Sequence, residues 1–108
     1  VELSTYNVLV TIDGEEKVNG KKLFPKLSIK DNFTIKKFDF VAEENLVAIT
    51  TWVFIKNKVK VKYFEGKEST IVKTGFANGL GGNKGGVIIF LKFDSTWISL
   101  VNCHLTAG

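Results

Sequence analysis

The stretch VIIFLKFDSTWISLVNCH, residues 87–104, decides the fold, because it contains two strand-like runs separated by one tight turn. Residues 87–93 and 96–104 are rich in β-branched and aromatic side chains, which favour pleated sheet. Asp94 and Ser95 between them form a two-residue connection of the kind that closes a β-hairpin. We therefore expect two antiparallel strands side by side.

The second of these runs carries two polar groups on one face. Side chains two residues apart on a strand point the same way, so Asn102 and His104 share a face with Ile98 and Leu100. An apolar wall thus gives way to polar groups at the strand end, where a pocket is expected. An imidazole there can hydrogen-bond a phosphate oxygen or, when protonated, stabilise developing charge. The alternative is a structural or surface histidine.

A glycine-rich segment precedes the hairpin. Residues 75–86 hold six of the ten glycines of the chain, together with Lys84. Glycine lets backbone N–H groups approach a ligand closely, so such a loop with one cation can surround an anion. A flexible turn is the alternative on composition alone. The segment is not a Walker loop, because it lacks the Gly-Lys-Ser/Thr ending and precedes a strand.

The rest of the chain also has strand composition. Further strands are expected at residues 1–10, 33–41, 46–55 and 69–73. The first strand is expected to end near Asn7. Judged from its neighbours in the sequence alone, Asn7 is an edge or turn residue. Residues 13–32 contain several turn dipeptides and are expected to form a long connection. Residues 56–62 fit a solvated edge or a short helical turn, and the apolar run 46–55 fits burial on both faces.

Composition excludes some classes of protein. The 108 residues include fifteen lysines and no arginine, and the net charge of +4 favours anionic partners without selecting one. The single cysteine, Cys103, cannot form an internal disulfide, which fits a reducing compartment. The longest apolar run is about ten residues, well short of the roughly 20 that a membrane-spanning helix needs.

Several segments, taken in order, resemble the inositol polyphosphate 5-phosphatases. They are residues 5–8 (TYNV), 44–49 (ENLVAI), 53–56 (VFIK), 74–87 (ending GNKGGV) and 101–108 (VNCHLTAG). The most specific feature is the GNKGGV segment followed, one hairpin later, by VN-x-HL-x-AG. The resemblance covers residues 1–10 and roughly 40–108.

The resemblance implies an α+β protein with the DNase I-like four-layer α/β/β/α sandwich, of which residues 1–108 form a partial, sheet-dominated domain. It implies a Mg²⁺-dependent hydrolase that removes the 5-phosphate from phosphoinositides or inositol polyphosphates by attack of an activated water. The expected location is the cytoplasm, including the cytosolic face of membranes, and no nucleic acid partner is expected.

The resemblance also assigns roles to particular residues. His104 is expected to contact the scissile phosphate as a catalytic residue, with Asn102 in support. Asn7 is expected in the metal and phosphate region. The residues expected to bind the substrate's phosphates are Asn83, Lys84 and Gly85. Phosphoryl transfer needs donors and a metal to neutralise charge on the phosphoryl oxygens, which fits these residue types.

The sequence departs from the family pattern in three ways, one of which is a glycine-rich loop one residue longer than the usual spacing between Thr-Gly and Asn-Lys. The sequence also has no Gln-Glu pair at a strand end, where the family places a metal-binding Glu, and it stops at Gly108, before the Gly-Asp-x-Asn and Pro-Ala-Trp-x-Asp-Arg motifs. We therefore expect a fragment that does not turn over substrate alone. The alternatives are a non-catalytic phosphoinositide-binding remnant of such a domain, or a nuclease or sphingomyelinase relative of the same fold.

Overall fold

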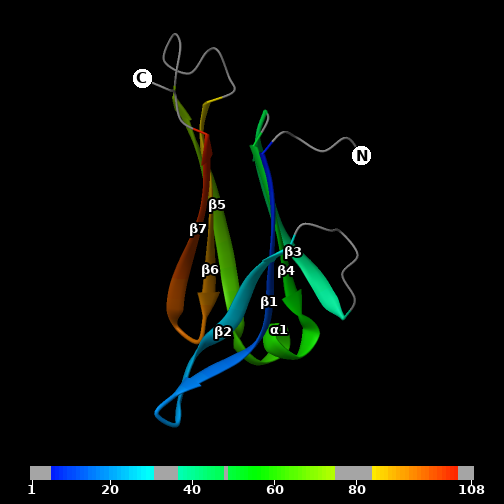
Figure 1. The fold of residues 1–108 in the computed structure, drawn as a ribbon, viewed down its shortest axis with the longest axis vertical. Coiled ribbons are helices and arrows are strands. Elements are labelled where there is room, and N and C mark those ends of the chain that lie inside the picture. The colour runs from blue at the N-terminus through cyan, green and yellow to red at the C-terminus, as the bar shows by residue number, and fades with distance from the viewer. Residues whose placement is uncertain (1–5, 31–36, 48, 75–83, 105–108) are drawn as a thin grey trace.

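The computed structural model describes residues 6–30, 37–47, 49–74 and 84–104. Within these ranges the chain forms seven strands and one short helix (Figure 1). Their bounds are β1 Tyr6–Val18, β2 Lys21–Lys30, β3 Phe38–Leu46, β4 Ile49–Lys56, α1 Asn57–Tyr63, β5 Phe64–Thr74, β6 Lys84–Phe93 and β7 Thr96–His104. The expected dominance of sheet is confirmed for this part of the chain. None of its helical structure is long and apolar enough to cross a membrane.

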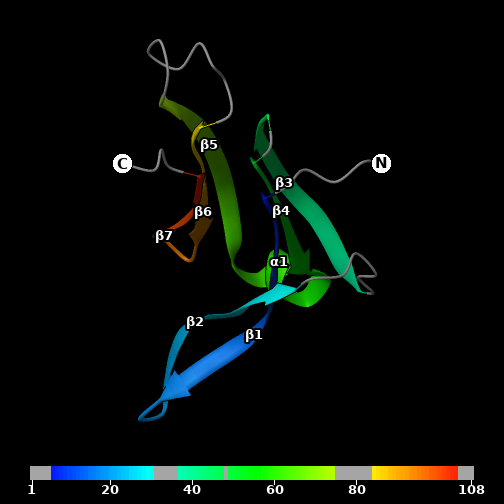
Figure 2. The same ribbon diagram turned by 45° about the horizontal axis from the view of Figure 1, so that its top comes forward.

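The strands form two sheets that face each other (Figures 1 and 2). The first sheet has the order β2-β1-β4-β3, and the second has the order β5-β6-β7. The pair β1 and β4 is parallel, whereas the other neighbouring strands are antiparallel. Helix α1 follows β4 directly and leads into β5, so it joins the two sheets at one end of the sandwich.

The hairpin expected at residues 87–104 is confirmed. Strands β6 and β7 pair from Phe93 and Thr96 at the turn to Gly85 and His104 at the open end. Asp94 and Ser95 both have positive φ, 49° and 67°. A two-residue turn with positive φ at both positions has the twist that matches antiparallel strands.

The long connection expected at residues 13–32 is wrong. Strand β1 runs on to Val18 and pairs with β2 across a two-residue turn at Asn19 and Gly20, whose φ angles are 53° and 77°. Asn-Gly is a strong hairpin signal, but the flanking residues are polar and charged. They need no apolar alternation because the tip of the hairpin projects away from the two sheets (Figure 2). Asn7 consequently lies near the start of β1, not near its end.

The apolar run expected as one strand at residues 46–55 is divided between two strands. Strand β3 ends at Leu46 and β4 begins at Ile49, with Val47 in a turn at φ 48°. The expected burial on both faces holds for the start of β4, since Thr50 and Thr51 are both buried. Of the two interpretations of residues 56–62, the helical one is confirmed by α1.

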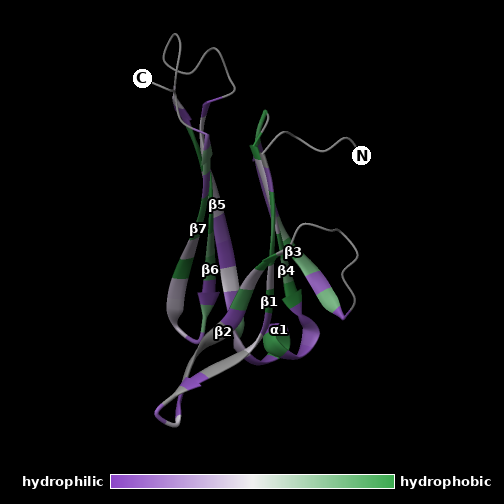
Figure 3. Ribbon diagram, in the orientation of Figure 1, coloured by the Kyte–Doolittle hydropathy of each residue, from purple (hydrophilic) through white to green (hydrophobic). Residues whose placement is uncertain are grey.

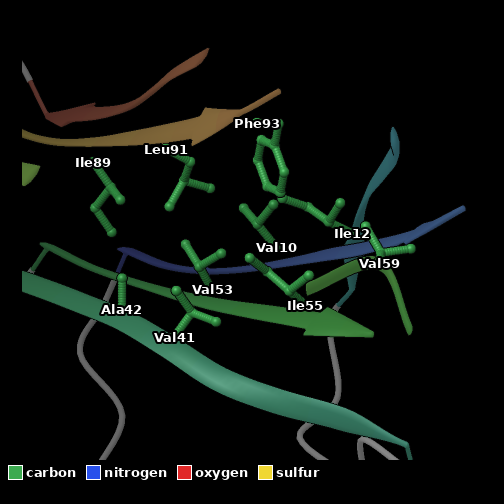
Figure 4. Packing of buried hydrophobic residues seen from close by; sticks show 10 residues of the cluster. All are labelled: Val10, Ile12, Val41, Ala42, Val53, Ile55, Val59, Ile89, Leu91 and Phe93. Atoms are coloured by element: carbon green, nitrogen blue, oxygen red, sulfur yellow. The ribbon is translucent and has the colours of Figure 1, made fainter. Parts of the chain in front are cut away.

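One hydrophobic core fills the space between the sheets (Figure 4). Alternate residues of β6 point into it, which is why burial along most of this strand has a period of two. The buried cluster comprises Val10, Ile12, Val41, Ala42, Val53, Ile55, Val59, Ile89, Leu91 and Phe93. In Figure 3, β4 is largely hydrophobic and the tip of the β1–β2 hairpin is hydrophilic. The core therefore depends on contacts between strands far apart in the sequence.

Candidate functional site

Ends of strands from both sheets lie at one end of the sandwich, opposite α1 (Figure 1). Strand β6 begins there at Lys84, and β7 ends there at His104, because the two strands are antiparallel. The parallel strands β1 and β4 both begin at this end, with Asn7 opposite Thr50. The fold thus gathers Asn7, Lys84 and His104 at the same end from three separate parts of the sequence.

The face that β7 turns toward the core has the expected composition. Ile98, Leu100, Asn102 and His104 are half-buried, while the residues between them are exposed. Ile98 and Leu100 pack against the core, so the apolar wall lies toward the middle of the sandwich. Asn102 and His104 continue the same face beyond it. The alternation seen in the sequence therefore places two polar groups at the rim of the core.

Lys84 and His104 are in direct contact. The Lys84 ammonium Nζ lies 2.7 Å from Nε2 of the His104 ring, and both side chains are half-buried. Because an ammonium group only donates hydrogen bonds, Nε2 must accept, which places the ring proton on Nδ1 in a neutral imidazole. Only one of the three ammonium N–H groups is used in this contact. The ammonium of Lys84 and the imidazole of His104 therefore lie side by side in a half-buried position.

Gly85 lies beside this contact, opposite His104 in the β6–β7 ladder. Its φ is +139°, and a Cβ atom placed there would lie 1.9 Å from the Val72 carbonyl oxygen and 3.0 Å from Leu46 Cδ2. Real Cβ atoms do not approach backbone oxygen so closely, so only glycine fits. The absence of a side chain brings the start of β6 close to β5 and to β3. Gly85 thus sets the backbone position from which Lys84 projects.

Asn102 connects the two sheets. Its side-chain Nδ2 donates to the Thr50 carbonyl oxygen and to Thr51 Oγ1, with both donor–acceptor distances at 3.2 Å. Thr50 and Thr51 belong to β4 in the first sheet, and Thr50 is the neighbour of Asn7 on β1. Asn7 is half-buried. The structure therefore places Asn102 between the strand end that carries Asn7 and the strand end that carries His104.

Sequence reasoning missed three threonines at this end. Thr50 and Thr51 interrupt the apolar run before β4 becomes uniformly hydrophobic, and buried hydroxyls in such a run are a signal of a polar contact. Thr74, opposite Lys84 in the β5–β6 ladder, has a buried Oγ1 without a hydrogen-bond partner in the described ranges. Asn83, expected to meet the substrate, lies outside the described residues.

The described residues do not fit a magnesium site. Mg²⁺ prefers an octahedral shell of oxygen ligands that includes carboxylates. No group of three His, Cys, Asp or Glu side chains that could hold a metal occurs in the described part of the chain. The side chains brought together at this end are instead an ammonium, an imidazole, a carboxamide and the Thr51 hydroxyl. Such a set suits an anion rather than a metal cation.

Comparisons with known proteins point to one family. A model of endonuclease/exonuclease/phosphatase family 2 matches residues 8–108. A probable inositol polyphosphate 5-phosphatase of Schizosaccharomyces pombe is 48% identical over 65 residues, which is 60% of this chain and 5% of that protein. A phosphatidylinositol 3,4,5-trisphosphate 5-phosphatase 2B of Danio rerio is 41% identical over 68 residues, 63% of this chain and 5% of that protein.

A third relative, a polyphosphatidylinositol phosphatase of Saccharomyces cerevisiae, is 36% identical over 72 residues, 67% of this chain and 6% of that protein. The chain therefore spans only about a twentieth of the length of these relatives. No match to this chain was found among solved structures. Since the family model covers nearly all of the sequence, the chain belongs to endonuclease/exonuclease/phosphatase family 2, whose domain has the DNase I-like fold.

Proposed function

We propose that this chain is part of a hydrolase that removes the 5-phosphate from phosphoinositides or inositol polyphosphates, and that Lys84 and His104 hold the phosphate. The contact of 2.7 Å between Lys84 Nζ and His104 Nε2 carries the proposal. The names of the three relatives support the substrate class, since each contains a phosphatase activity on inositol phosphates or phosphoinositides.

The chemistry of the contact favours a phosphate. A phosphoryl oxygen that enters between the two groups replaces the direct contact: Lys84 donates to one oxygen, and a protonated His104 donates from Nε2 to another. Charge-assisted hydrogen bonds of this kind are roughly twice as strong as neutral ones. They gain further strength in a half-buried position, where water screens less. Both donors then neutralise charge on the same phosphoryl group, as hydrolysis requires.

Mg²⁺ remains part of the proposal as the expected cofactor, although the described residues do not form its site. When bound, the ion would supply charge neutralisation and an activated water. Its carboxylate ligands would have to come from outside the set that Lys84, His104 and Asn102 form. Asn7, at the start of β1, is the described residue that we propose to lie nearest the metal region, because its carboxamide oxygen is a ligand type that Mg²⁺ accepts.

The outer faces of both sheets support the four-layer arrangement. On the second sheet, Trp97 is 49% exposed and Val101 63% exposed, and both point away from the core. On the first sheet, Phe40 is 54% exposed and packs edge-to-face on Phe54, with 5.6 Å between the ring centroids. Apolar residues on a sheet face are commonly covered by helices. We propose that helical layers cover these faces. The expected location, the cytoplasm including the cytosolic face of membranes, stays a prediction.

A second candidate is favoured by the lack of a carboxylate cluster among the described residues. If the domain only binds inositol headgroups, Lys84 and His104 are sufficient and no such cluster is needed. Phosphate release separates the two functions. The hydrolase predicts Mg²⁺-dependent release of the 5-phosphate, from a soluble inositol trisphosphate or from lipid vesicles, by a longer protein that contains this chain. Binding of both substrates without release of phosphate would favour the binding module. Nicking of DNA would favour the nuclease relative.

Replacing Lys84 with alanine is expected to weaken binding of a soluble inositol trisphosphate by about ten- to a hundredfold, because one charge-assisted hydrogen bond is lost. Isothermal titration calorimetry at physiological salt measures the change. The matched control is Lys58→Ala, since Lys58 is an exposed lysine on α1 at the opposite end of the sandwich. That variant should change affinity less than about twofold, because salt screens distant charges. Equal losses in both variants would show that only net charge attracts the ligand.

A further inference from the structure

The side chain of Asn102 is committed to the opposite sheet. Its Nδ2 carries two N–H groups, and the two acceptors at 3.2 Å are the Thr50 carbonyl oxygen and Thr51 Oγ1. Both acceptors belong to buried residues of β4, more than fifty positions away in the sequence. The two bonds run from one sheet to the other, so they resist any separation of β7 from β4. Asn102 is therefore a polar clamp across the sandwich.

Apolar packing is thin at the end where this clamp lies. The main buried cluster ends at Ile89 on β6, and a small cluster of Leu46, Ile49 and Val87 continues beyond it. Past Val87 the next residues toward the start of β6 are Gly86 and Gly85, which contribute no side chains. Hydrophobic contact alone therefore does little to hold the end of β7 against β4. The two hydrogen bonds of Asn102 hold the end of β7 against β4 instead.

The opposite edge of the sandwich is tied differently. Lys67 Nζ donates to the Val41 carbonyl oxygen, and Ser69 Oγ donates to Glu44 Oε2 at 2.7 Å, so β5 is joined to β3. Between β2 and β7 there is instead an apolar pocket of about 160 Å³. Its lining residues are Val8, Val10, Leu27, Ile29, Thr51, Ser99, Leu100, Val101 and Asn102. Beside this pocket, Asn102 supplies the polar tie between the sheets that Lys67 and Ser69 supply at the other edge.

The position of His104 depends on this clamp. His104 follows Asn102 by two residues on the same face of β7, a distance of about 7 Å along the strand. The contact between Lys84 and His104 tolerates a shift of only about half an ångström before it ceases to be a good hydrogen bond. The β6–β7 ladder pairs His104 with Gly85 and holds β7 beside β6, while the clamp holds the end of β7 against β4. Loss of the clamp would therefore let the last residues of β7 move away from the first sheet, and the His104 ring would move with them.

We propose that Asn102 is a positioning residue: it ties the end of β7 to Thr50 and Thr51 and so, together with the pairing of β7 with β6, fixes the His104 ring beside Lys84, rather than contacting the phosphate itself. This inference rests on the proposed function for its effect on ligand binding. Its effect on the ring of His104 does not depend on any ligand. The pocket beside the clamp admits water, which can satisfy Thr51 when Asn102 is removed, so the variants should still fold.

The test exploits the single histidine of the chain, since the ring signals of His104 need no assignment. We would compare Asn102→Ala, Thr51→Val and the double variant by ¹⁵N NMR of the ring and by calorimetry with a soluble inositol trisphosphate. Thr51→Val removes the acceptor with little change of shape. Ser99→Ala is the control, because Ser99 lines the same pocket and is exposed. Urea unfolding checks that each variant is folded.

Each single variant is expected to move the Nε2 resonance of His104 and to weaken binding by about three- to tenfold, the size of one or two hydrogen bonds. The double variant should bind no more weakly than Asn102→Ala, because that variant already removes the bond that Thr51→Val removes. Ser99→Ala should change neither quantity. If Asn102→Ala weakens binding but leaves the ring resonances of His104 unchanged, Asn102 contacts the ligand directly and the inference is overturned.

An unmoved ring resonance in both single variants would also overturn it. If the unaltered protein does not bind the inositol trisphosphate at all, the proposed function fails, and the ring resonances alone still decide whether Asn102 positions His104.

Discussion

Replacing Gly85 with alanine is expected to lower the free energy of unfolding by about 3 kcal/mol or more. Two costs combine: a non-glycine residue at positive φ is strained by about 1–3 kcal/mol, and overpacking adds about 1–3 kcal/mol. At Gly85, φ is +139° and the new methyl group would lie 1.9 Å from the Val72 carbonyl oxygen. Backbone cannot yield as a flexible side chain can, so strand β5 or β6 must move.

Chemical denaturation followed by circular dichroism measures this loss. The matched control is Gly66→Ala, because Gly66 also lies in a strand of the second sheet and a Cβ atom placed there would meet nothing within 4 Å. That variant should change stability by less than about 1 kcal/mol. If the two alanine variants unfold at the same denaturant concentration, the close approach of β6 to β5 at Gly85 does not exist in solution.

Truncating Ile89 to alanine is expected to destabilise the protein by about 2–5 kcal/mol, the usual cost of removing a buried isoleucine and leaving a cavity. Ile89 is fully buried at the centre of β6 and belongs to the cluster that joins the two sheets (Figure 4). A protein of this length has a total stability of only about 5–15 kcal/mol, so the loss is a large share of it.

The same substitution at Ile29 provides the comparison. Ile29 lies on β2 and is 73% exposed, so Ile29→Ala should cost less than about 1 kcal/mol. Thermal unfolding of both variants, monitored by the fluorescence of the two tryptophans, gives the difference. Similar midpoints for the two variants would mean that the two sheets do not share one core.

The parts of the fold that the sequence predicts are those that local pattern determines. The β6–β7 hairpin has strong alternation and a two-residue turn, and it forms as expected. The β1–β2 hairpin has an equally good Asn-Gly turn, but the residues next to the turn are polar, the tip projects from the sandwich, and composition alone suggests a loop. The turn between β3 and β4 lies inside an apolar run, at the β-branched residue Val47, which has positive φ. Composition therefore does not reveal this turn.

The candidate site shows the same division. The shared face of Asn102 and His104 follows from the period of a strand and needs no tertiary information. The contact of His104 with Lys84 depends on how β6 and β7 pair, which the hairpin register fixes but composition does not. The partners of Asn102 on β4 are more than fifty residues away, so only the packing of the two sheets identifies them.

Lys84 and His104 are proposed to form one phosphate-binding contact, and this contact can be observed directly. The most direct measurement is a long-range ¹H–¹⁵N correlation spectrum of the single histidine ring at about pH 8, where an ordinary imidazole is neutral. We predict a ring protonated on Nδ1, an Nε2 resonance that moves in Lys84→Ala, and a response to added inorganic phosphate that this variant loses. A ring protonated on Nε2, with the same spectrum in Lys84→Ala and no response to phosphate, would contradict the proposal.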